Sequence, residues 1–121
     1  MANNNVHDFA IKWLTRFKSS EIHKYLISDD TSFANECFEL GFDMDCGKSL
    51  ISAYPDQNVF DDYQVFQTII DKINDIHILG SAIFSKWRYF NHWAYSSEKI
   101  TLPENKQWFI LALERLVKLS D

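Results

Sequence analysis

The stretch Ser85–Tyr95, SKWRYFNHWAY, places aromatic rings and basic side chains next to one another. At 100° per residue, Trp87 and Phe90 continue an apolar helical stripe, and a core position explains them. A second, polar line follows at i, i+4 and i+7, formed by Arg88, His92 and Tyr95, and Asn91 lies between the two lines. It predicts a candidate pocket lined by Arg88, Asn91, His92 and Tyr95. The simpler interpretation, which the sequence favours, is that Asn91 bonds a helix end, Arg88 pairs with an acid and His92 faces water.

Motifs that would mark a phosphate or metal site fail on spacing. The sequence GFDMDCGKS at residues 41–49 ends like a phosphate-binding loop, but it is one residue too long, and Phe42 stands where glycine is required. The same stretch begins like a calcium loop, yet Gly47 replaces the third ligand and Tyr54 occupies the twelfth position. We therefore expect no metal and no cofactor here.

Nucleophiles and histidines give no local signature of catalysis. The four histidines show no pairing that would put two imidazoles on one helical face. Cys37 and Cys46 have no CxxC spacing, which is typical of free thiols in a reducing compartment. No hydrolase or cysteine-protease motif surrounds a serine or cysteine. Binding is therefore favoured over catalysis, although folding can still bring distant histidines together.

Charge is distributed unevenly along the chain. Residues 1–28 carry four bases and two acids, residues 29–75 carry eleven acids and two bases, and residues 76–121 carry six bases and four acids. Such a middle segment can steer a basic partner, or it can simply be a solvated acidic face. Its candidate contacts are the acids Asp29, Asp30, Glu36, Glu39, Asp43, Asp45, Asp61 and Asp62, with Phe42 and Tyr54 as aromatic anchors. The net charge of −5 argues against general nucleic-acid binding.

The elements that must position these residues are helices. Hydrophobic residues make up 46% of the chain, whereas glycine and proline number only 3 and 2. Apolar residues recur with a period of 3.6. The pattern predicts helical stretches at 6–17, 21–27, 33–40, 45–53, 56–73, 76–94 and 101–119. We expect an all-α, single-domain bundle of five or six helices over residues 1–121, with the C-terminal helix central because it is apolar around most of its circumference.

Single residues give three further expectations about packing. Asp56 is expected to cap a long helix, and Gly80, on the apolar face of 76–94, to let a neighbouring helix approach closely. Arg115 shares a helix face with buried positions, so we expect a carboxylate of the acidic segment within salt-bridge distance of it. A charge without a partner at that position would be too costly.

The N-terminus lacks the basic start and apolar run of a secretory signal, and no stretch approaches the roughly 18 apolar residues of a membrane span. The sequence therefore predicts a cytoplasmic protein that does not enter membranes.

The C-terminal half, ILGSAIFSKWRYFNHWAY followed by LPENKQWFILALERL, resembles a small bacterial family of helical proteins without an assigned activity. The resemblance implies a bacterial helical domain and supplies no catalytic residue. Two function classes stay open. The first is a small acidic interaction or regulatory module that binds a basic protein, as immunity proteins and phosphate mimics do. The alternative is a ligand-binding or catalytic bundle with a pocket around Arg88 and His92, and self-association is compatible with either.

Overall fold

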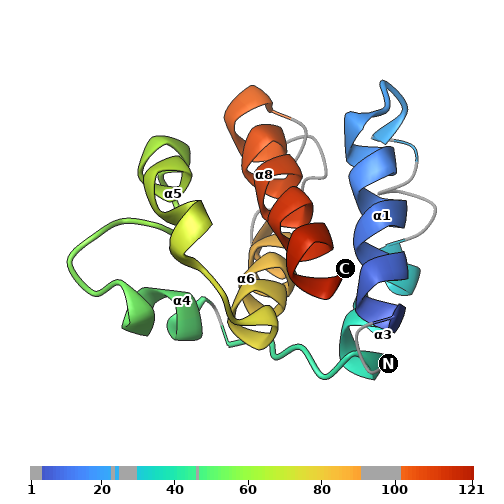
Figure 1. Ribbon diagram of the computed structural model, residues 1–121. Helices are drawn as coiled ribbons and strands as arrows, with labels where there is room; N and C mark the ends of the chain where they lie inside the picture. Colours follow the sequence, from blue (N-terminus) through green and yellow to red (C-terminus); the bar gives the residue numbers. More distant parts are fainter. Residues whose placement is uncertain (1–3, 23, 25–29, 46, 91–101) are drawn as a thin grey trace.

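The computed structural model describes residues 4–22, 24, 30–45, 47–90 and 102–121, and within these ranges the chain forms helices and no strands (Figure 1). The elements are α1 (Asn4–Lys18), α3 (Asp30–Glu39), α4 (Lys48–Ala53), α5 (Tyr63–Ile69), the 3-10 turn η1 (Ile70–Lys72), α6 (Ile76–Arg88) and α8 (Pro103–Ser120). The all-α bundle expected from the sequence is thereby confirmed. Among these helices, none combines the length and apolar character needed to cross a membrane.

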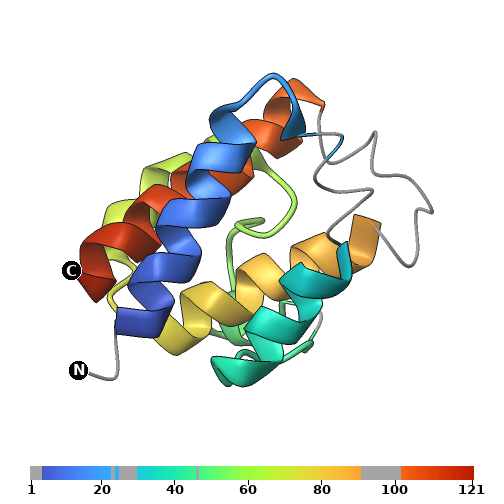
Figure 2. The ribbon, with the colours of Figure 1, turned by 90° about the vertical axis from the view of Figure 1, so that its right-hand side faces the viewer.

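Helix α8 lies at the centre of the bundle, as the sequence predicts. It runs beside α1, has α5 on its opposite side, and also packs on α6 and η1 (Figures 1 and 2). Helices α3 and α4 pack on α6 instead. Trp108, Phe109, Ala112, Leu113 and Leu116 of α8 are each at most 1% exposed. Because α8 has neighbours on several sides, it needs apolar residues around most of its circumference.

Aromatic contacts join helices that are far apart in the sequence. Phe17 of α1 stacks on Phe109 of α8 with ring centroids 4.8 Å apart. On the other side of α8, Phe66 of α5 stacks on Trp108 at 4.4 Å. Phe33 of α3 stacks on Trp87 of α6 at 5.0 Å. Trp87 and Phe90 are 7% and 8% exposed, which confirms that these aromatic residues of SKWRYFNHWAY belong to the core.

The chain between α4 and α5 differs from the prediction, because no long helix begins at Asp56. Helix α5 starts at Tyr63, and Asp62 is its cap, with its carboxylate accepting from the backbone N–H groups of Gln64 and Val65 at 3.0 and 3.3 Å. Val59 and Phe60 of the preceding stretch are buried. The carbonyl oxygen of Val59 accepts a hydrogen bond from a side chain of α8, and that of Phe60 from a side chain of α6. Both oxygens are therefore satisfied by tertiary hydrogen bonds instead of helical ones.

Gly80 does permit a close approach, but the neighbour is an aromatic ring and not a helix. Gly41, with φ of 80°, ends α3 in a left-handed turn. The next residue, Phe42, lays its ring against Gly80, where a Cβ would stand only 2.2 Å from Phe42 Cε1. Phe42 is 3% exposed in this position. It is therefore part of the core and does not serve as the surface anchor that the sequence predicted.

Arg115 finds its partners in the acidic segment, but they are not carboxylates. Its Nε donates to the carbonyl oxygen of Ile73 at 2.9 Å. Its Nη2 donates to the carbonyl oxygen of Asp71 at 3.0 Å and to Asn74 Oδ1 at 2.8 Å. The prediction of a salt bridge is wrong, since Arg115 is only partly buried and three neutral oxygens at and after the end of η1 accept from its guanidinium.

Candidate functional site

A groove of about 320 Å³ lies between α1 and α3. It is lined by Asn5, Asp8, Phe9, Lys12, Glu36, Glu39 and Leu40. Phe9 and Phe33 face the core, which turns the polar side of each helix toward the groove. On α1, Asp8 and Lys12 are four residues apart and lie on the same face. The groove between the two helices is therefore lined by three carboxylates and a single ammonium group.

Glu36 is the deepest carboxylate of this groove. Its Oε1 lies 2.6 Å from Lys12 Nζ, and its side chain is 26% exposed. Its Oε2 is buried and has no hydrogen-bond partner among the described residues. Within the same ranges, the carboxylates of Asp8 and Glu39 make no hydrogen bond or ion pair. The groove consequently keeps a negative charge that Lys12 alone does not neutralise.

The other predicted partner contacts do not lie on this surface. Asp61 and Asp62 directly precede α5, which is on the opposite side of α8 from α1 (Figure 1). Tyr54 ends α4 and lines a separate, open groove of about 600 Å³ with residues 72–78. Asp29 and the side chain of Asp30 lie outside the described residues. Folding therefore separates the acidic run of the sequence into several places.

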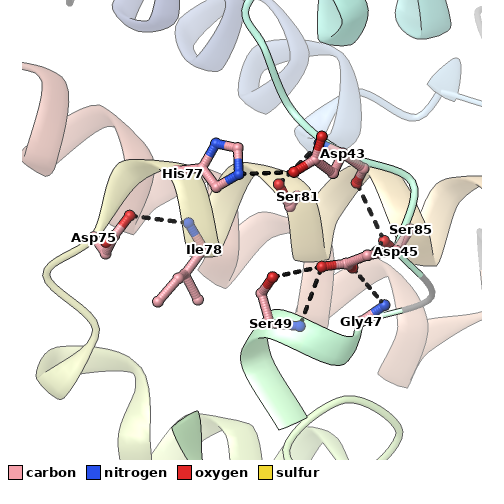
Figure 3. Close-up of polar contacts among 9 residues, drawn as sticks. All are labelled: Asp43, Asp45, Gly47, Ser49, Asp75, His77, Ile78, Ser81 and Ser85. Atoms are coloured by element: carbon pink, nitrogen blue, oxygen red, sulfur yellow. Dashed lines mark hydrogen bonds and ion pairs between the residues drawn. The ribbon is translucent and has the colours of Figure 1, made fainter. Parts of the chain in front are cut away.

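Asp45 joins the loop before α4 to α6 (Figure 3). Its carboxylate accepts from the backbone N–H groups of Gly47 and Ser49 and from the hydroxyl groups of Ser49 and Ser85, at 2.5 to 3.1 Å. Partial burial alone would raise the pKa of Asp45, but the hydrogen bonds from Ser49, Ser85 and Gly47 outweigh it and hold the pKa below its ordinary value. Asp45 is therefore a structural acid.

Asp43, two residues earlier, makes a second link to α6. Its Oδ2 lies 2.9 Å from Nε2 of His77, and its backbone N–H donates to Ser81 Oγ at 2.9 Å (Figure 3). Neither Asp43 nor Asp45 belongs to a cluster of three or more histidine, cysteine or acidic residues in the described ranges. The two acids that resembled the start of a calcium loop thus hold the loop before α4 against α6.

The pocket predicted around SKWRYFNHWAY is described at one residue only. Arg88 is half-buried, and its Nη1 lies 3.4 Å from Met44 Sδ. The remaining candidates, Asn91, His92 and Tyr95, lie outside the described residues. An acidic partner for Arg88 is not found within them, and the pocket stays a prediction.

Sequence reasoning missed Asp8, which the structure places beside Glu36 and Glu39. The signal was present, since Asp8 and Lys12 follow one another at i and i+4 on the polar side of the first predicted helix. That Lys12 would meet Glu36 depended on how α1 and α3 pair, which helical periodicity does not encode.

Comparison of the chain with family models, with curated proteins and with solved structures gives no match. The resemblance to a bacterial helical family therefore stays a prediction.

Proposed function

We propose that the chain is a small interaction module that binds a basic protein partner through the groove between α1 and α3. A lysine or arginine side chain of the partner enters between Asp8, Glu36 and Glu39. The proposal includes the cytoplasmic location and the bacterial origin expected from the sequence. It is supported by one observation above all, the buried Oε2 of Glu36, which has no hydrogen-bond donor in the part of the chain that the structure describes.

The physical reason is the free-energy cost of leaving that buried oxygen without a hydrogen bond. A buried acceptor without a donor costs about 1–3 kcal/mol, and more when it is charged. An incoming guanidinium or ammonium that displaces the side chains over Oε2 would supply the donor, and it would meet the exposed carboxylates of Asp8 and Glu39 at the mouth of the groove. A groove of about 320 Å³ is large enough for one long side chain, at the lower end of the range for small ligands. The remaining negative charge would accelerate the encounter with a basic surface.

The test uses a fluorescein-labelled hexa-arginine peptide and fluorescence anisotropy. We expect binding to the unaltered chain at about 20 mM salt and much weaker binding at about 300 mM, because screening shortens the range of the attraction. The double variant Asp8→Asn/Glu39→Gln should bind about tenfold more weakly, from the loss of two charges worth up to about 1 kcal/mol each.

The matched control is Asp56→Asn/Asp71→Asn. Both residues are exposed, and the variant loses the same two charges away from the groove. It should bind within about twofold of the unaltered chain. Equal weakening by the two double variants would show that only net charge matters, and would refute the groove as the binding site.

A further inference from the structure

Residues 54–62, which connect α4 to α5, are held in place by two side chains from other helices. Val59 and Phe60 are 0% and 8% exposed, and the rest of this 54–62 segment is largely exposed. The carbonyl oxygen of Val59 accepts from Trp108 Nε1 of α8 at 3.3 Å. The carbonyl oxygen of Phe60 accepts from Lys86 Nζ of α6 at 2.5 Å. Hydrogen bonds to two adjacent carbonyl groups therefore hold the 54–62 segment where α6 packs against α8.

Lys86 is an unusual donor for such a bond, because a lysine is rarely buried and Lys86 is only 3% exposed. Its Nζ lies 4.7 Å from the ring centroid of Trp108, 5.1 Å from that of Phe60 and 5.8 Å from that of Phe90. Within the described residues, no carboxylate oxygen lies within 4.0 Å of it. The charged group that acts on it is Asp61, in the 54–62 segment itself. Lys86 also meets Trp108 of α8 and Phe90, which follows α6, and neither of these side chains titrates.

We propose that the 54–62 segment is a strap whose closure over α6 and α8 is coupled to the release of a proton from Lys86. When the strap is closed, Lys86 is enclosed by rings and one carbonyl oxygen. When it opens, Phe60 leaves and the amine regains water. The protonated amine therefore favours the open strap, and the neutral amine favours the closed one.

The size of the coupling follows from linkage. Burial lowers the pKa of Lys86 from 10.5 to about 8, and Asp61 opposes this only in part. The aromatic contacts attract the charged form and help to keep it enclosed at neutral pH. Because the open form has the higher pKa, opening takes up a proton between these two values. The equilibrium constant for opening should therefore fall about tenfold from pH 7 to pH 9.

The experiment measures hydrogen exchange of the backbone amides of residues 57–62, corrected for the intrinsic dependence of exchange on pH. We expect the corrected opening constant of the unaltered chain to fall about tenfold between pH 7 and pH 9. Lys86→Met, which cannot titrate, should show no such slope. Lys72→Met removes an exposed lysine elsewhere and should keep it. Amides of the α1 core, around Trp13, separate local opening from global unfolding, because they should exchange much more slowly than residues 57–62.

A direct titration keeps the test decisive if Lys86→Met does not fold. The ¹³Cε resonance of Lys86, followed by NMR, should titrate with a midpoint near 8. A midpoint above about 10 would overturn the proposal, because the pKa of the enclosed amine would then equal that of a lysine in water. An unchanged slope in Lys86→Met would overturn it as well.

Discussion

The effect of Gly80→Ala on the free energy of unfolding should be unfavourable or favourable depending on the residue at position 42. A Cβ at Gly80 would lie 2.2, 2.3 and 2.5 Å from Cε1, Cζ and Cδ1 of Phe42, well inside van der Waals contact. Phe42 is 3% exposed, and its ring also meets that of Phe9, with centroids 6.1 Å apart. The ring therefore has little room to move. Overpacking of this kind costs about 1–3 kcal/mol.

Alanine also has an intrinsic advantage over glycine inside a helix, worth about 1 kcal/mol. In the unaltered chain the clash at the ring should prevail, so Gly80→Ala should lower the free energy of unfolding by up to about 2 kcal/mol. In Phe42→Ala the ring is gone and only the helical advantage remains. There Gly80→Ala should raise the free energy of unfolding by about 1 kcal/mol.

The assay is chemical denaturation followed by circular dichroism, applied to the four proteins of the cycle. Phe42→Ala itself should cost about 3–5 kcal/mol. If that leaves no folded baseline, Phe42→Val is the milder background, since it removes the ring atoms that a Cβ at Gly80 would meet but deletes less buried volume than Phe42→Ala. An effect of Gly80→Ala that is the same in both backgrounds, or a stabilised Gly80→Ala single variant, would refute the packing argument.

Three further outcomes follow from the bonds of individual side chains. Arg115→Lys should destabilise the chain by about 1–3 kcal/mol in thermal or chemical denaturation, because a single ammonium cannot reach all three oxygens that Arg115 binds, and the carbonyl group of Ile73 is buried. Asp62→Ala should lower stability by about 1 kcal/mol through loss of the cap of α5, whereas Asp62→Asn should lose much less. Asp45 has a lowered pKa, so its contribution is present above about pH 4 and is lost as the pH falls through its folded-state pKa. The stability difference between the unaltered chain and Asp45→Asn should therefore shrink on acidification, and a difference that stays constant down to pH 2 would contradict this assignment.

The sequence alone determined the class of fold and most of what each long helix buries. Its 3.6-residue period placed α1, α6 and α8 and their buried aromatic residues, because a helix repeats its core contacts at a local spacing. It also predicted that α8 would be central, since only a helix with several neighbours is apolar around most of its circumference. Asp75, the residue before the predicted helix 76–94, caps α6 by accepting from the backbone N–H of Ile78 at 3.0 Å.

Only the tertiary structure decided how the charged and irregular parts are used. Helix α5 starts at Tyr63 and not near Asp56, and Val59 and Phe60 are instead buried, with their carbonyl oxygens bonded to side chains of α8 and α6 that are distant in the sequence. Phe42 turned into the core, and Arg115 bonded to backbone oxygens. In the structure, the acids of the middle segment cap helices, bond the loop before α4 to α6, or line the α3 side of the groove. Long-range charge pairs such as Lys12–Glu36 depend on which helices become neighbours, and local periodicity carries no information about that choice.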